Sequence, residues 1–102
     1  MKILQGDSFY IPFEITVDGV EQVTEDDIEK VEIAIGDLVK YYPEEISFMD
    51  GRFLFHLSQE ETFNMSEGPL EVQVRVKFAT GNTVGQKVGP IDVRRSITSE
   101  VL

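Results

Sequence analysis

Histidine is the side chain best suited to acid–base catalysis near neutral pH, and this chain contains one, His56. It stands between Phe55 and Leu57 in an alternating segment, which predicts a strand that turns His56 toward solvent. A general base needs a partner and a pocket, and no Ser–His–Asp spacing surrounds His56. The chain has no cysteine, which excludes disulfides, thiolate metal sites and cysteine nucleophiles. We therefore expect a protein without enzymatic activity.

Acidic residues that could bind metal or transfer protons gather at 25–29, 44–45 and 60–61. A calcium loop alternates oxygen ligands around a central glycine, and residues 25–29 do not follow that pattern. Thr24 can instead cap a short helix, with Asp27 at the reciprocal position of a capping box. The pairs Glu44–Glu45 and Glu60–Glu61 lie in turn-like segments that predict exposure. These carboxylates are interpreted as helix-start and surface residues, and no metal is expected.

Three glycines, Gly81, Gly85 and Gly89, recur at intervals of four residues and raise the question of a phosphate-binding loop. Such a loop also requires a following Lys-Ser or Lys-Thr and a helix that opens there. Neither follows these glycines, so they are interpreted as turn and bulge residues. No cofactor is expected.

The formal net charge of −10 is unevenly distributed along the chain. Residues 1–67 carry 16 acidic and 4 basic residues, a net of −12, whereas residues 68–102 carry 3 and 5, a net of +2. Nucleic-acid binding requires a basic surface, so we expect none. The acidity is consistent with solubility. It is also consistent with head-to-tail contact between neighbouring copies, in which Arg94 and Arg95 meet the acidic part of the next copy.

Nothing in the hydropathy pattern predicts a membrane segment. The longest uncharged stretch, residues 78–86, has nine mostly polar residues, whereas a membrane helix needs about 20 apolar residues. Met1 is followed by Lys2 and a strand-like run rather than by an apolar signal region. We expect no membrane association, and we expect the protein to be made in the cytoplasm.

Alternation of apolar and polar residues dominates the chain and predicts strands. The alternating or strand-like segments are 9–17, 31–35, 38–42, 46–48, 53–57, 70–78 and 83–94. Pro12 lacks an amide donor, which favours an edge or bulged strand, and Gly89–Pro90 predicts a break or bulge within the last strand.

Turn dipeptides separate these strands at Asp18–Gly19, Gly36–Asp37, Asp50–Gly51 and Gly81–Asn82. A second capping pattern, Ser58–Glu61, predicts a helical turn that ends near Phe63. About seven strands, with no helix longer than about two turns, favour an all-β antiparallel sandwich or barrel. We expect one domain over residues 1–102, with one or two single-turn helices and a weakly apolar tail at the end.

The order of these segments over residues 5–95 resembles a family of phage proteins. Gly6–Asp7 opens a strand, residues 50–57 read DGRFLFHL, and Leu57–Thr62 precedes Val72–Val76. This order resembles small structural proteins of tailed phages and prophages of Gram-positive bacteria. It is similar in particular to the immunoglobulin-like N-terminal domain of baseplate upper proteins. The resemblance implies an immunoglobulin-like β-sandwich and a virion component without enzymatic activity.

The expected function is therefore that of a phage or prophage structural or adaptor protein. It would act through protein–protein contacts in a tail, baseplate or related assembly, as a homo-oligomer or with other phage proteins. Candidate interface residues are Tyr10, Tyr41, Tyr42, Leu54, Met65, Arg94 and Arg95. Alternation leaves the five apolar ones exposed or marginal, unless some of them complete the core of a second sheet. A carbohydrate-binding module is the alternative, although the chain has no tryptophan and three tyrosines.

Overall fold

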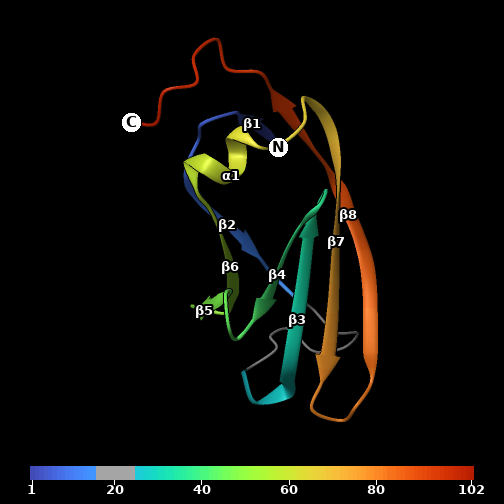
Figure 1. The fold of residues 1–102 in the computed structure, drawn as a ribbon. Helices are drawn as coiled ribbons and strands as arrows, with labels where there is room; N and C mark the ends of the chain where they lie inside the picture. The colour runs from blue at the N-terminus through green and yellow to red at the C-terminus, as the bar shows by residue number, and fades with distance from the viewer. Residues whose placement is uncertain (16–24) are drawn as a thin grey trace.

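The computed structural model describes residues 1–15 and 25–102 as two β-sheets packed face to face with one short α-helix (Figure 1). The elements in chain order are β1 (Lys2–Leu4), β2 (Phe9–Phe13), the 3-10 turn η1 (Glu25–Asp27), β3 (Ile28–Ile35), β4 (Leu38–Tyr42), β5 (Ser47–Met49), β6 (Arg52–Leu57), α1 (Gln59–Phe63), β7 (Gly68–Phe78) and β8 (Thr83–Arg94). The predicted all-β sandwich is confirmed. The strand predicted over residues 9–17 ends at Phe13, so the prediction is wrong for Glu14 and Ile15. Residues 16–17, the Asp18–Gly19 turn and the Thr24 cap lie outside the described residues.

The two sheets differ in width. In the part of the chain that the structure describes, the large sheet has five strands in the order β1-β8-β7-β3-β4, and the small sheet has three in the order β2-β6-β5. Every pairing is antiparallel except that of β1 with β8, which is parallel. Strand β1 is the strand that the alternation pattern did not separate, and it raises the number of described strands from about seven to eight.

Local sequence signals account for the main irregularities of the strands. Asp50 and Gly51 both have positive φ, 53° and 78°, which is the backbone twist that joins β5 and β6 in a two-residue hairpin. Pro12 lies on β2, an edge strand of the small sheet, as predicted. Gly89 and Pro90 together face Glu71 across the β7–β8 ladder, so the predicted bulge is also confirmed.

The core fills the space between the sheets with the inward-facing residues of each strand. Phe53 and Phe55 of the small sheet are at most 1% exposed, and they face the aliphatic residues of the large sheet. The buried apolar residues of the described chain are Ile3, Ile11, Ile28, Val31, Ile33, Ile35, Ile46, Phe53, Phe55, Leu57, Met65, Val72, Val74, Val76, Ile91 and Val93. Their period of two along each strand is what makes one face of each sheet apolar.

Helix α1 closes one end of the sandwich through a buried hydroxyl. Ser58 and Glu61 form the predicted capping box at its start. Thr62 is completely buried; its Oγ1 accepts a hydrogen bond from Gly6 N–H at 2.9 Å and donates to Asp7 O at 2.8 Å. Gly6 has φ of +96°, and a Cβ there would stand 2.7 Å from Phe63 Cζ, so only glycine fits this loop against the helix.

Replacing Thr62 with valine should lower the free energy of unfolding by about 1–3 kcal/mol, because the part-buried Gly6 N–H loses its acceptor. Urea denaturation would measure the loss. Thr62→Ser keeps the hydroxyl and should cost less, about 0.8 kcal/mol for the missing methyl group. Equal losses for the two variants would show that the hydrogen bonds of Thr62 do not stabilise this end of the molecule.

Candidate functional site

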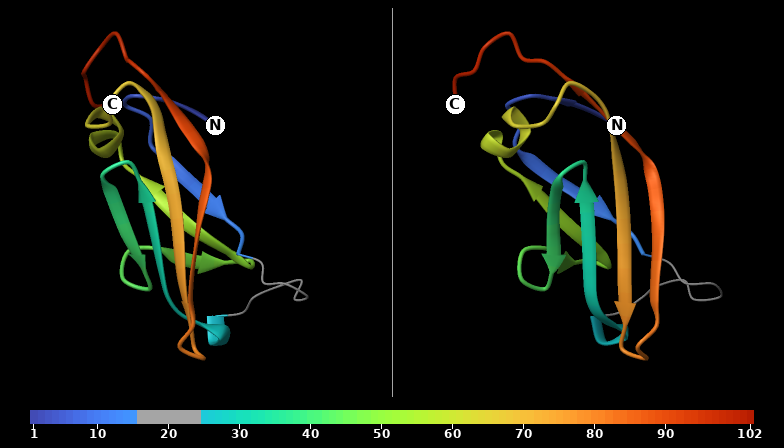
Figure 2. Two further views of the ribbon diagram at one scale, coloured as in Figure 1. Left: turned by 90° about the vertical axis from the view of Figure 1, so that its right-hand side faces the viewer. Right: turned by 45° about the vertical axis from the view of Figure 1, so that its right-hand side comes forward.

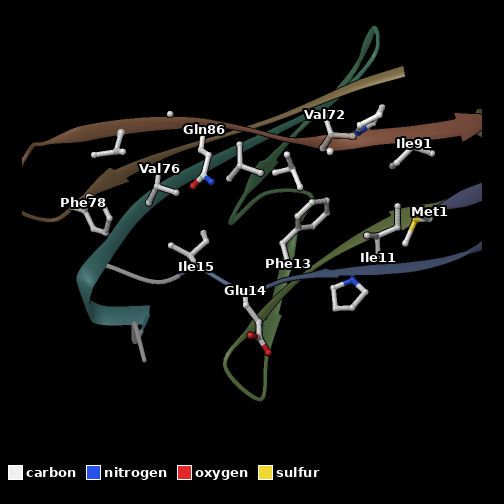
Figure 3. Close-up of a pocket in the computed structure, with 17 residues that line it drawn as sticks. Met1, Ile11, Phe13, Glu14, Ile15, Val72, Val76, Phe78, Gln86 and Ile91 are labelled. Carbon is white, nitrogen blue, oxygen red and sulfur yellow. The ribbon is translucent and has the colours of Figure 1, made fainter. Parts of the chain in front are cut away.

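An apolar groove of about 890 Å³ runs between β2 of the small sheet and the β7–β8 hairpin of the large sheet (Figure 3). We call it the groove. Residues of β2 and the segment after it form one wall, β7 forms the floor, and β8 forms the other wall. Its lining residues are Met1, Ile11, Pro12, Phe13, Glu14, Ile15, Val72, Val74, Val76, Phe78, Val84, Gly85, Gln86, Val88, Gly89, Pro90 and Ile91.

The groove exists because the small sheet is too narrow to cover β8. Val84 pairs with Val76 and Val88 with Val72, which places Val84 and Val88 on the inward face of the large sheet. Val72 and Val76 are buried, whereas Val84 and Val88 are 58% and 46% exposed. Inward-facing valines that stay exposed mark a part of the core that the described strands leave uncovered.

Two strand edges border the groove on its open side (Figure 2). Among the described residues, β2 pairs only with β6, and β1 covers β8 only along Asp92–Arg94. Unpaired strand edges recruit other strands unless they are guarded. Pro12 lines the groove and, like every proline, has no amide hydrogen to offer, so the β2 edge is partly guarded.

Gln86 is the polar side chain that points into the groove between the two valines of β8 (Figure 3). It is exposed, and its amide has no hydrogen-bond partner among the described residues. Glu14 also lines the groove, but its carboxylate turns away from β8 and pairs with Arg52 Nε at 3.0 Å. The groove is thus an apolar channel with one amide available for a hydrogen bond and an acid at one end.

The opposite side of the sandwich is closed by a polar contact beside α1. Lys40 points inward from β4, donates to His56 O at 2.6 Å and lies 2.9 Å from Glu61 Oε2. Its ammonium also stands 5.2 Å from the centre of the Phe55 ring. Burial alone would raise the pKa of Glu61, but hydrogen bonds from the Ser58 N–H and Lys40 outweigh it and hold that pKa below its ordinary value.

Two of the predicted interface residues, Tyr10 and Leu54, lie on the outer face of the small sheet. Tyr10 is 58% exposed and stacks at a tilt on His56, with 4.6 Å between the ring centres. Leu54 lies on the same face, opposite Pro12 and next to His56 on β6, and is half-buried. His56 therefore faces outward as predicted, and it lines neither the groove nor the second cavity described below.

Tyr41 and Tyr42 point to opposite faces of β4. Tyr41 lies on the outer face of the large sheet and hydrogen-bonds Glu32, which raises the pKa of Tyr41. Arg75 holds the same Glu32 through two hydrogen bonds of 2.7 and 2.8 Å, and this contact lowers the pKa of Glu32. Tyr42 faces inward and packs edge-on against Phe53 with 5.0 Å between ring centres. Tyr42 therefore packs in the core. This is the alternative that the sequence left open for the predicted interface residues.

Met65 is only 7% exposed, so the prediction that it is exposed or marginal is wrong. It follows α1, and its side chain packs into the core as the helix turns back toward β7. Arg94 and Arg95 are exposed near the end of β8; Arg94 pairs with Asp92 at 3.0 Å, and Arg95 makes none of the ion pairs found among the described residues. The seven predicted residues thus separate into several places rather than one surface.

Sequence reasoning missed the groove residues Val84, Gln86 and Val88. Their alternation is visible in the sequence, and it predicts the face on which they lie. Their exposure depends on the number of strands in the opposite sheet, for which the sequence carries no local signal.

A second cavity, of about 760 Å³, lies between α1 and residues 95–101. Across residues 1–15 and 25–102, no three His, Asp or Glu side chains gather closely enough to hold a metal ion. None of the described helices has the length and apolar character that crossing a membrane requires.

Comparison with models of protein families, with curated proteins and with solved structures finds no match to this chain. The resemblance to baseplate upper proteins therefore remains a prediction from the sequence.

Replacing Glu61 with glutamine should lower the free energy of unfolding at pH 7 by about 1–2 kcal/mol, because Lys40 loses its charged partner while a capping acceptor remains. The folded-state pKa of Glu61 is lowered, so its contribution is complete above the ordinary value of 4.5 and is lost as pH falls through the folded pKa. Denaturation curves should therefore show the difference between native protein and Glu61→Gln shrinking below about pH 4.5. A difference that stays constant down to pH 2 would contradict this account.

Proposed function

We propose that this chain is a non-enzymatic structural or adaptor protein of a phage or prophage that acts by docking an extended protein segment in its groove. The docked segment belongs to a tail, baseplate or related assembly, which would make the chain a virion component. The phage setting is supported by the resemblance of residues 50–57 and the surrounding strand order. The docking role is supported by the groove itself.

The observation that carries the proposal is the pair of inward-facing valines left exposed on β8. Covering one such side chain stabilises a complex by up to roughly 1.5–3 kcal/mol, and Val84 and Val88 are about half exposed. A strand laid beside β2 would cover both of them and would also meet an unpaired backbone edge. In the isolated chain this surface exposes apolar side chains to water, which is unfavourable. In the complex the docked segment covers those side chains as a fourth strand of the small sheet.

The shape of the groove favours an extended peptide over a compact ligand. It follows β8 from Val84 to Ile91, which is seven residue steps or about 23 Å at 3.3 Å per residue. Its polar groups are few, and alternating valines along one wall fit a partner whose side chains also alternate. These are properties of strand addition, in which backbone contacts give affinity and side-chain pockets give specificity.

The carbohydrate-binding alternative finds less support in the arrangement of the tyrosines. Tyr10 and Tyr41 lie on the outer faces of different sheets, and Tyr42 packs in the core. A sugar-binding platform needs aromatic faces exposed side by side, and these three side chains do not form one.

Placing charges in the groove should remove the chain from its assembly. We expect the native chain to co-purify with tail or baseplate particles after prophage induction, and the double variant Val84→Asp/Val88→Asp to be incorporated about tenfold less or worse, because the docked segment would bury both carboxylates. Immunoblotting of purified particles measures this.

Thr83→Asp is the matched control, because Thr83 pairs with the outward-facing Lys77 and lies on the other face of β8. It should be incorporated like the native chain. Absence of the native chain from particles would overturn the phage setting, and equal incorporation of the groove variant would overturn the docking role of the groove.

A further inference from the structure

Residues 95–102 form a tail whose apolar side chains have no place in the core. Ile97, Val101 and Leu102 are 97%, 63% and 100% exposed. The tail is held at its start, where Ser96 N–H donates to Gln5 Oε1 at 3.2 Å. From there it passes over α1, on the side of the molecule away from the β7–β8 hairpin tip (Figures 1 and 2). The tail of one chain is therefore directed away from that chain's own groove.

The side chains of the tail match those of the groove in type and spacing. Ile97 and Val101 are four residues apart, as are Val84 and Val88 on β8. Ser99 stands midway between the two apolar residues of the tail, and Gln86 stands midway between the two valines of the groove. In an extended segment Ile97, Ser99 and Val101 share one face. Docked in the groove, Ile97 and Val101 would lie against the two valines of β8, and the Ser99 hydroxyl would lie against the Gln86 amide.

We propose that residues 95–102 of one copy occupy the groove of a second copy, as a fourth strand of its small sheet. This inference rests on the proposed function, because it names the segment that the groove docks. With Ile97 placed beside Val84, residues 97–102 extend over five residue steps, about 17 Å at 3.3 Å each, and so cover most of the groove's length of about 23 Å from Val84 to Ile91. Pro12 limits the backbone ladder that the tail can form with β2, so the side-chain match carries much of the selectivity.

Charge bears on the direction of this pairing. Residues 95–102 carry one basic residue, Arg95, near their start and one acidic residue, Glu100, near their end, so the tail has no formal net charge. A tail that runs antiparallel to β2 enters at the Glu14 end of the groove and brings Arg95 close to the exposed Glu14–Arg52 ion pair, where it can share the carboxylate of Glu14. The same direction places Ile97 beside Val84 and Val101 beside Val88.

Docking of this kind is head-to-tail, because each copy offers a tail and a groove at different places. Such contacts build a ring if the rotation between copies closes and an open filament if it does not. Covering two apolar side chains predicts weak association, so oligomers should form as protein concentration rises rather than persist on dilution.

Cysteine trapping tests the proposal on a clean background, because the chain has no cysteine of its own. A chain carrying Val84→Cys is mixed with a mass-tagged chain carrying Ile97→Cys, and Val88→Cys is paired with Val101→Cys in the same way. Under mild oxidation we expect both mixtures to give covalent heterodimers at about ten times the yield of Thr83→Cys with Ile97→Cys, the outward-facing control. The crossed pair, Val84→Cys with Val101→Cys, should also give the lower yield.

A single chain that carries both Val84→Cys and Ile97→Cys should form a ladder of covalent oligomers. An internal disulfide in a monomer would overturn docking to a second copy, as would equal yields from Val84→Cys and Thr83→Cys. Particle incorporation separates this inference from the proposed function. If trapping fails while incorporation still requires Val84 and Val88, another protein occupies the groove; if incorporation is also independent of them, both proposals fall.

Discussion

The unequal width of the two sheets is the constraint on which the rest of this structure depends. Within residues 1–15 and 25–102 five strands face three, so the apolar face of the large sheet extends beyond the small sheet along β8. Where the sheets overlap, Phe53 and Phe55 fill the space between them and are buried in the core. Where they do not, Val84 and Val88 remain half exposed. The groove and the exposed amide of Gln86 follow from that mismatch, and among the described residues one edge of β2 pairs with no strand.

The space between the sheets is closed differently on the two sides of the sandwich. On the β4 side, the inward-pointing Lys40 ties the large sheet to His56 O and Glu61, so a charge and its partners close the space between the sheets. Buried Thr62 fixes the loop after β1 against α1. No such polar closure occurs along the described residues of the groove, whose walls are mainly apolar. The sandwich is therefore closed on its β4 side and exposes apolar side chains on its groove side, which is the side where a partner could bind.

Features set by neighbouring residues could be read from the sequence. Asp50–Gly51 predicts its hairpin because both positions take positive φ, Pro12 predicts an edge strand because it lacks a donor, and Gly89–Pro90 predicts the bulge. The parallel pairing of β1 with β8 joins residues about 90 positions apart, for which no local signal exists. The inward position of Tyr42 and the burial of Met65 also depend on how the sheets pack. The groove belongs to this second class, since it arises from the count of strands in each sheet.

The central claim is that the groove is an unfilled strand position. Amide hydrogen–deuterium exchange, followed as protein concentration rises, tests it most directly because it reports each segment separately. The account predicts that protection grows together in residues 9–15, 83–90 and 95–102, while Val31–Ile35 stay equally protected throughout. Exchange in 9–15 and 83–90 that does not change with concentration, in a sample shown to associate, would contradict it.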